Sequence, residues 1–233
     1  MKQLLHLGLA VALASGAGVA QAYKAGDVVL RLGAATVDPD SSSDKINLGV
    51  DGVPPLEAEV DSDTQLGIVP MWMVTDDFGL ELLAATPFEH DISVGGPGLS
   101  LDAGSTKHLP PTLTLQWYPR GGHDGWQPYL GVGVNYTYFF DESVDGQLKG
   151  ALGSLLGATG AKLDLGDSFG MSASAGVDIP FGEHWAFNAG VWYIDIDTNA
   201  KLTARFADGS TAPVKFDVHI DPWVYNVGIA YKF

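Results

Sequence analysis

The C-terminal stretch DPWVYNVGIAYKF (221–233) decides the fold. Its side chains alternate with a period of two residues, which is the period of a β-strand. Bulky apolar residues occupy the odd positions from Trp223 to Phe233, and small or polar residues such as Asn226 and Lys232 occupy the even ones. A strand in a membrane barrel turns apolar bulk towards lipid and small or polar groups towards the lumen, with aromatic residues near its ends. The stretch is therefore typical of a membrane-spanning strand.

The same alternation predicts eight strands, at 26–37, 64–74, 78–88, 110–118, 127–140, 168–179, 185–197 and 219–233. The connections alternate between long ones (38–63, 89–109, 141–167 and 198–218) and short ones (75–77, 119–126 and 180–184). This pattern predicts an all-β fold, an eight-stranded antiparallel up-and-down transmembrane β-barrel with short periplasmic turns and four long extracellular loops. The alternative is a soluble β-sandwich or lipocalin-like barrel. Four long structureless loops in a small soluble domain would be unusual, which counts against it.

Composition excludes several classes of function. The 233 residues carry a formal net charge of −16, which disfavours nucleic acid as a partner. Cysteine is absent, so disulfides, thiolate metal sites and cysteine nucleophiles are excluded. At the N-terminus a positive Lys2, an apolar stretch and the small-x-small sequence that ends at Ala22 predict a signal peptide over 1–22. The barrel domain is then 23–233, beginning at Tyr23.

Strand parity predicts which side chains point into the barrel. A charge that faces the middle of a bilayer costs on the order of a few kcal/mol, so Glu81 must point inward. The same reasoning on three strands predicts a channel lining in the outer half of the lumen by Val69, Met71, Met73, Leu83, Trp192 and Ile194. Three charged residues, Arg31, Glu81 and Lys232, are expected deeper, towards the periplasm, where they can pair and close the lumen. An apolar lining is either an ordinary packed core or a conduit for apolar molecules, and the residues alone favour the core.

Three prolines indicate where the barrel wall is weak. Pro87 ends the third predicted strand, and Pro110 and Pro111 begin the fourth, which is its neighbour. Proline donates no ladder hydrogen bond, so a cluster at facing strand ends weakens the pairing. The pattern predicts a lateral opening at this seam, and the alternative is that the prolines only end the strands.

Other motifs carry little chemistry. The G-x-S-x-G pattern at 166–170 opens a strand rather than a strand-turn-helix unit. The five histidines after the signal peptide lack metal-ligand spacing, and His90 and His108 are expected to anchor loops at the outer rim by hydrogen bonds. The acidic run 38–44 begins like a calcium loop but lacks its glycine and its closing glutamate, so a solvated loop is favoured over cation bridging. We predict no catalytic residue, metal site or cofactor.

Several segments resemble the OmpW/AlkL family of outer membrane proteins: 75–92, 107–119, 127–140, 191–198 and 221–233. The resemblance implies a bacterial outer-membrane location and a narrow hydrophobic channel that passes small apolar molecules, with release sideways into the bilayer. Leu83 and Trp192 lie in matching segments and are expected to form a constriction.

The resemblance also implies partners: outer-membrane lipid and lipopolysaccharide, small hydrophobic solutes, and the barrel-assembly machinery, for which Phe233 would be the terminal aromatic residue. Two alternatives remain. One is a structural or adhesive barrel with a plugged lumen, and the other is a lipid-modifying barrel enzyme built from Ser105, Ser168 and His108.

Overall fold

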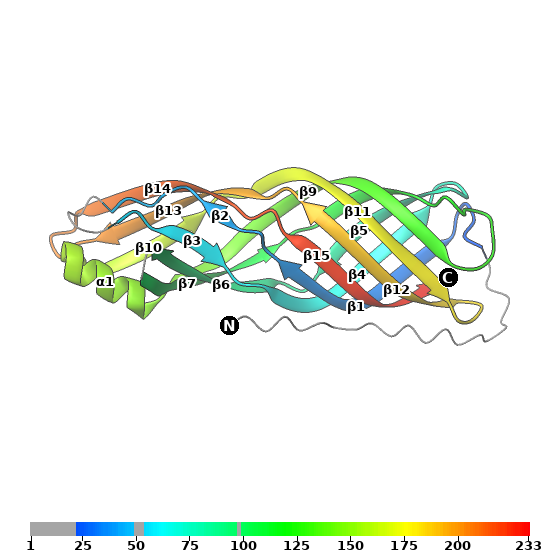
Figure 1. Cartoon of the computed structure of the whole chain (residues 1–233), viewed down its shortest axis with the longest axis horizontal. Helices are drawn as coiled ribbons and strands as arrows, with labels where there is room; N and C mark the ends of the chain where they lie inside the picture. The colour runs from blue at the N-terminus through cyan, green and yellow to red at the C-terminus, as the bar shows by residue number, and fades with distance from the viewer. Residues whose placement is uncertain (1–21, 49–53, 97–98) are drawn as a thin grey trace.

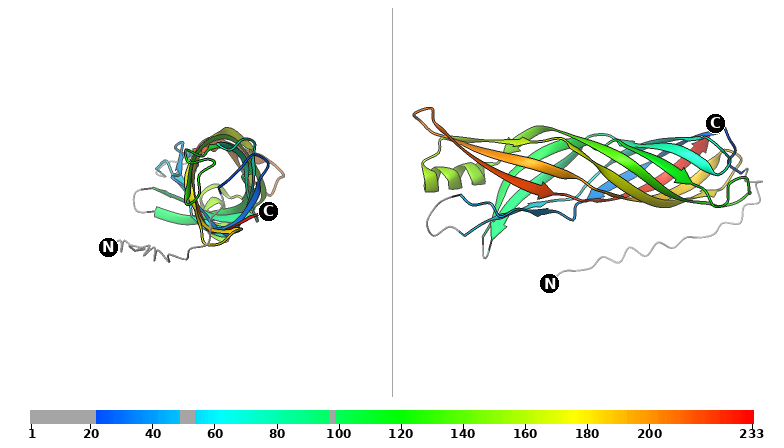
Figure 2. Two further views of the ribbon diagram at one scale, coloured as in Figure 1. Left: turned by 90° about the vertical axis from the view of Figure 1, so that its right-hand side faces the viewer. Right: turned by 90° about the horizontal axis from the view of Figure 1, so that it is seen from above.

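Eight strands close into an antiparallel barrel in the computed structural model, which describes residues 22–48, 54–96 and 99–233 (Figure 1). The predicted signal peptide, apart from Ala22, lies outside the described residues. The last strand pairs with the first, so no edge remains, and the end-on view of Figure 2 shows the closed ring. In ring order the strands are β1 (Val28–Asp38), β4 (Asp63–Met73), β5 (Phe78–Ala85), β8 (Thr112–Trp117), β9 (Gln127–Val144), β11 (Ser168–Pro180), β12 (Trp185–Ile194) and β15 (Trp223–Lys232).

The predicted parity of the strands is confirmed. On β15, Trp223 and Val227 are 43% and 57% exposed, whereas Asn226 between them is fully buried. Exposed aromatic side chains lie near both ends of the barrel exterior, at Trp117 and Trp185 beside the short turns and at Tyr138 beside the long connections. The exterior is thus an apolar band with aromatic ends, as lipid requires.

The four long connections are not structureless loops. They continue the barrel beyond the apolar band as an extension, seen at the left of Figure 1. In one part of the extension, β3, β6 and β7 continue the sheet from the far end of β9. The other part is a separate four-stranded sheet in the order β10, β13, β14 and β2. The extension contains β2 (Ser42–Ser43), β3 (Glu57–Val60), β6 (Phe88–Gly96), β7 (Leu99–Leu109), α1 (Gly146–Leu156), β10 (Gly160–Leu165), β13 (Asp197–Arg205) and β14 (Thr211–His219).

Apolar side chains on the inner faces of these elements explain why the extension is ordered. Leu202 on β13, Leu163 on β10 and Val94 on β6 are buried in one cluster, together with Leu148 and Leu152 of α1. Asp145 caps the N-terminus of the helix, because its side chain accepts a hydrogen bond from the Gln147 amide. No helix among the described residues is long and apolar enough to cross a membrane.

Candidate functional site

A wide apolar cavity lies inside the extension, and we call this cavity the funnel. It encloses about 950 Å³, including the open space at its mouth. All its lining side chains are apolar except His90, Thr106, His108 and Thr198. The apolar lining comes from every part of the extension: Ile46, Leu48, Leu56, Ala58, Val60, Ile92, Val94, Ala103, Phe139, Val144, Leu148, Leu163, Leu165, Ile196, Ala200, Leu202, Phe216, Val218 and Ile220.

None of the six predicted channel-lining residues lines the funnel. Val69, Leu83, Trp192 and Ile194 lie below it, in a fully buried cluster that fills the middle of the barrel. Trp192 is the largest of these side chains, and its indole N–H donates to Glu81 at 3.2 Å. The predicted constriction of Leu83 and Trp192 is therefore a closed packing layer.

Met71 and Met73 were expected in the outer half of the lumen, and this placement is wrong. Met71 lies opposite Glu81 in the strand ladder, and Met73 lies opposite Gly79, next to a short turn. Both pack with Tyr23 at the short-turn end, which is the predicted periplasmic end. The error arises because β4 runs towards that end, so that its last residues are its deepest.

A buried ionic network fills the barrel between these two apolar layers. Arg31 forms ion pairs with Glu81 and with Asp178, the second at 2.7 Å, and all three side chains are fully buried. The Arg31 guanidinium also donates to the Tyr118 hydroxyl at 2.7 Å and lies 4.6 Å from the centre of the Tyr129 ring. The network therefore joins inward side chains of β1, β5, β9 and β11 across the lumen.

The neighbouring residues show how little space is left. A Cβ added at Gly176 would lie 2.3 Å from the Tyr129 ring, which is possible only for glycine. Tyr23 donates to Asp178 at 2.9 Å and covers the network from below. The Lys232 ammonium lies 3.6 Å from Asp27 and donates to the Ala22 carbonyl at 3.3 Å, nearer the short turns.

Asp178 was missed by the sequence reasoning. It lies on the inward face of β11 with Ser172 and Ser174, and the same parity argument that placed Glu81 inward applies to it. What the sequence does not show is that Asp178 and Glu81, on strands far apart in the chain, converge on one arginine.

The floor of the funnel is a pair of histidines that contact each other. The Nε2 atoms of His90 and His108 lie 2.8 Å apart, and both side chains are buried. His90 Nδ1 contacts the Asp61 carbonyl oxygen, which can only accept, so Nδ1 carries the hydrogen. His90 Nε2 is then the acceptor and His108 Nε2–H the donor. His108 Nδ1 has no hydrogen-bond partner among the described residues.

Burial keeps this pair neutral. It lowers the pKa of His108 to about 3, with a further contribution from His90, and it lowers the pKa of His90 in the same direction. The His108 ring is stacked between Phe88 and Phe139, with ring centres 5.5 and 5.7 Å away. The floor is therefore a neutral aromatic layer with one internal N–H···N hydrogen bond.

The strand ladder is interrupted beside this floor. Pairing of β5 with β8 stops at Leu83 and Thr112, and pairing of β6 with β7 starts at Phe88 and His108. Between them lies the seam, which we define as residues 84–87 opposite 109–111. No ladder pair joins its two sides among the described residues.

The three prolines have different positions at the seam. The Thr86 amide donates to Leu66 on β4, so by alternation Pro87 faces the seam. The Pro111 carbonyl accepts from Tyr136 on β9, so Pro111 faces away from the seam and Pro110 faces it. The Pro110 carbonyl accepts instead from the hydroxyl of Thr112 at 3.1 Å. Two of the donors that a closed ladder needs are therefore missing.

A small cavity lies against the seam and has about 220 Å³ of empty space, including the open space at its mouth. It is lined by Ala35, Leu83, Ala84, Ala85, Phe88, Pro110 and Val224. Phe88 belongs to this cavity and also stacks on His108 in the funnel floor. One aromatic layer thus separates the funnel from the gap in the barrel wall, while the route straight down is filled.

The residues of the predicted alternative enzyme do not meet in the described part of the chain. The Ser105 hydroxyl pairs with that of Ser143 at 3.0 Å, Ser168 accepts from the Asp197 amide, and His108 contacts His90. Among the described residues, no hydrogen bond joins Ser105 or Ser168 to His108.

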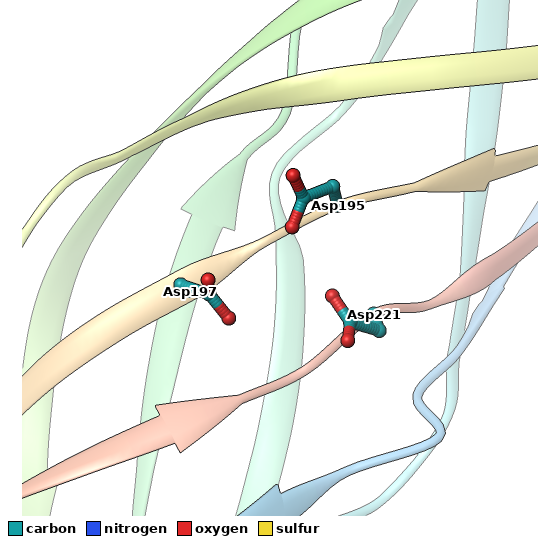
Figure 3. A group of neighbouring side chains, drawn as sticks. All are labelled: Asp195, Asp197 and Asp221. Carbon is teal, nitrogen blue, oxygen red and sulfur yellow. The ribbon is translucent and has the colours of Figure 1, made fainter.

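Three carboxylates gather where the barrel meets the extension (Figure 3). Asp195, Asp197 and Asp221 each bring one oxygen to within 4.8 Å of the others. Asp197 also contacts His219, and Asp221 accepts from the Ile196 amide. The group is largely exposed, so it is suited to weak cation binding at most.

Comparison with known proteins gives consistent matches over nearly the whole chain. The family model of the OmpW family matches residues 24–233. Outer membrane protein W of Vibrio cholerae is 42% identical over 235 residues, covering 100% of both chains. Outer membrane protein AlkL of Ectopseudomonas oleovorans is 26% identical, covering 91% of this chain and 84% of that one. The crystal structure of the outer membrane protein OprG from Pseudomonas aeruginosa is 45% identical, with a TM-score of 0.80, covering 92% of this chain and 99% of that one.

Proposed function

The chain belongs to the OmpW family and is a multi-pass β-barrel of the bacterial outer membrane, and from this premise we propose that it admits small apolar molecules through the funnel and releases them sideways at the seam. The observation that carries the proposal is the arrangement of space. An apolar cavity is open on the outside, the barrel below it is filled, and the wall between them has unpaired backbone.

The physical gain comes from replacing a polar barrier with an apolar surface. Apolar molecules are poorly soluble in the sugar layer outside the membrane, and each methylene removed from water contributes about 0.8 kcal/mol. The funnel offers an apolar lining from outside down to the histidine floor. A solute at the floor then needs only to pass Phe88 to reach the seam cavity.

The filled lumen explains why release is sideways. Passage to the periplasm would require the Arg31 network to open, which would leave two carboxylates and a guanidinium without partners in a low-dielectric interior. The seam lies level with Leu66 and Tyr136, whose side chains are half exposed on the lipid-facing exterior. Release there delivers the solute to the outer leaflet.

One experiment distinguishes a conduit for apolar molecules from a structural barrel with a plugged lumen. Vesicles with lipopolysaccharide in the outer leaflet are prepared with and without the protein, and the rate at which labelled n-octane reaches the bilayer is measured. We expect the protein to accelerate transfer without any increase in ion conductance. Equal rates in the two vesicle preparations would favour the plugged barrel.

The partners follow from the same placement. Lipopolysaccharide would surround the extension, and the terminal Phe233, which is 68% exposed at the short-turn end, would be read by the barrel-assembly machinery. Deleting Phe233 should lower the amount of folded protein in the membrane, and an unchanged amount would remove that assignment.

A further inference from the structure

We propose that His90 and His108 form a recognition site for one neutral hydroxyl group, so that the funnel favours apolar molecules that carry a single alcohol head group. This inference rests on the proposed function and names the solute class of the same conduit. It begins from the position of the pair, which is the floor of an otherwise apolar cavity and the layer next to the seam cavity.

The hydroxyls of the two threonines that line the funnel are already engaged. The Thr198 hydroxyl donates to the Gly166 carbonyl at 2.6 Å, and the Thr106 hydroxyl lies 3.4–3.5 Å from the carbonyls of Lys107 and Phe140. The two imidazoles therefore offer a donor and an acceptor to a head group. The head group reaches both by breaking one contact, the hydrogen bond between His90 and His108.

The pair is chemically complementary to a hydroxyl. His108 Nε2 supplies an N–H and His90 Nε2 supplies a lone pair, and a hydroxyl is both an acceptor and a donor. Inserted between the rings, it accepts from His108 and donates to His90, so every polar atom that it separates regains a partner. An alkane that parts the same rings leaves both buried nitrogens without a partner, which is unfavourable.

Charged head groups fit this site poorly. A carboxylate can only accept, so its second contact would set an oxygen against the His90 lone pair, and an ammonium can only donate. Asp61, Asp63 and Asp91 lie around His90 and act on it electrostatically, which further disfavours an anion. The protein chemistry thus selects a neutral head group.

The position of the rings connects recognition to release. His108 is stacked on Phe88, and Phe88 lines the seam cavity. A head group that separates His108 from His90 moves the ring that Phe88 packs against, at the boundary between the funnel and the seam cavity.

The test compares 1-octanol with n-octane in vesicles with lipopolysaccharide in the outer leaflet. The readout is the ratio of the two transfer rates, each corrected for the rate in protein-free vesicles. Two hydrogen bonds of about 1 kcal/mol each predict a preference for octanol of about thirtyfold. His108→Phe keeps an aromatic ring between Phe88 and Phe139 and should abolish the preference, and His90→Phe should do the same. His123→Phe, at an exposed histidine of a short turn, is the matched control and should retain it.

The outcomes are distinguishable. Loss of the preference in both floor variants, in protein that is folded by its heat-shifted mobility on gels, supports the site. A preference that persists in both variants, or octane and octanol transferred equally by the original protein, overturns the hydroxyl site and leaves the conduit standing. Transfer of neither probe above the protein-free rate overturns the conduit and the site together.

Discussion

Closing the seam with backbone hydrogen bonds should slow the release of solute. The structure assigns the missing donors to Pro87 and Pro110, because these two prolines face the seam while Pro111 faces β9. The perturbation is therefore the double substitution Pro87→Val and Pro110→Val, which restores two N–H groups with little change of side-chain volume. The matched control is Pro111→Val, the same change at the adjacent residue, on the other side of the strand.

The magnitude follows from the number of restored donors. Each new ladder hydrogen bond contributes about 1 kcal/mol, so two bonds favour the closed seam by about 2 kcal/mol. A difference of that size lowers the population of the open seam roughly thirtyfold. Transfer of n-octane should fall by about the same factor if release at the seam limits the rate.

The assay is the transfer of labelled n-octane into vesicles with lipopolysaccharide in the outer leaflet, at equal amounts of folded protein. The double variant should be slow and Pro111→Val should match the original protein. Equal transfer by all three proteins would refute the reasoning, because it would show that solute does not leave between residues 84–87 and 109–111. A loss in Pro111→Val alone would refute the assignment of which prolines face the gap.

Three further predictions concern the filled lumen and the extension. Arg31→Met leaves two buried carboxylates without their cationic partner and should lower the free energy of unfolding by about 3–5 kcal/mol. The measurement is urea unfolding followed by tryptophan fluorescence, and unchanged stability would contradict the network. Trp192→Ala leaves a cavity and should lower the free energy of unfolding by about 3–5 kcal/mol in the same measurement. The ion conductance of this variant in a planar bilayer should stay at baseline because the Arg31 network remains. A new conductance would show that the network does not close the lumen to ions. Asp197 raises the pKa of His219 above the ordinary 6.5, so the charged pair is present at low pH and is lost as the pH rises through the raised pKa. An NMR titration of His219 should show a midpoint above 6.5, and Asp197→Asn should lower that midpoint. An equal midpoint in both proteins would exclude the pair.

Most of the barrel could be predicted because lipid imposes one rule on every strand. A residue that faces hydrocarbon must be apolar, so the single charge at Glu81 fixes the direction of Leu83 and of the whole strand. The same rule gave the exposed face of β15 from Trp223 to Phe233. Parity along one strand needs no knowledge of its neighbours, which is why this part of the fold followed from the sequence.

The contacts between side chains on different strands could not be predicted, because they depend on the register between strands. The short turn at 75–77 already implies that 64–74 ends at the periplasmic side, so the depth of Met71 was within reach of the sequence, but only the register shows that Met71 lies opposite Glu81. The same limit hid the convergence of Asp178 with Arg31. At the seam, the sequence identified the proline cluster, but the contacts of neighbouring amides were needed to separate Pro110 from Pro111.

The funnel was missed for a different reason. The extension strands also alternate, with residues such as Leu202 turned inward, but their outer faces meet water and lack the aromatic bulk that marks a spanning strand. Length and acidity made these segments resemble loops. Only the pairing of β13 with β10 and β14 shows that they enclose a cavity.

The most direct test of the account is to locate a bromine atom by anomalous diffraction in crystals grown with 1-bromooctane. We expect a bromine position in the funnel or in the seam cavity beside Leu83 and Pro110, and none below Arg31. A bromine peak among Tyr23, Met73 and the short turns would show passage straight through the barrel and would contradict it.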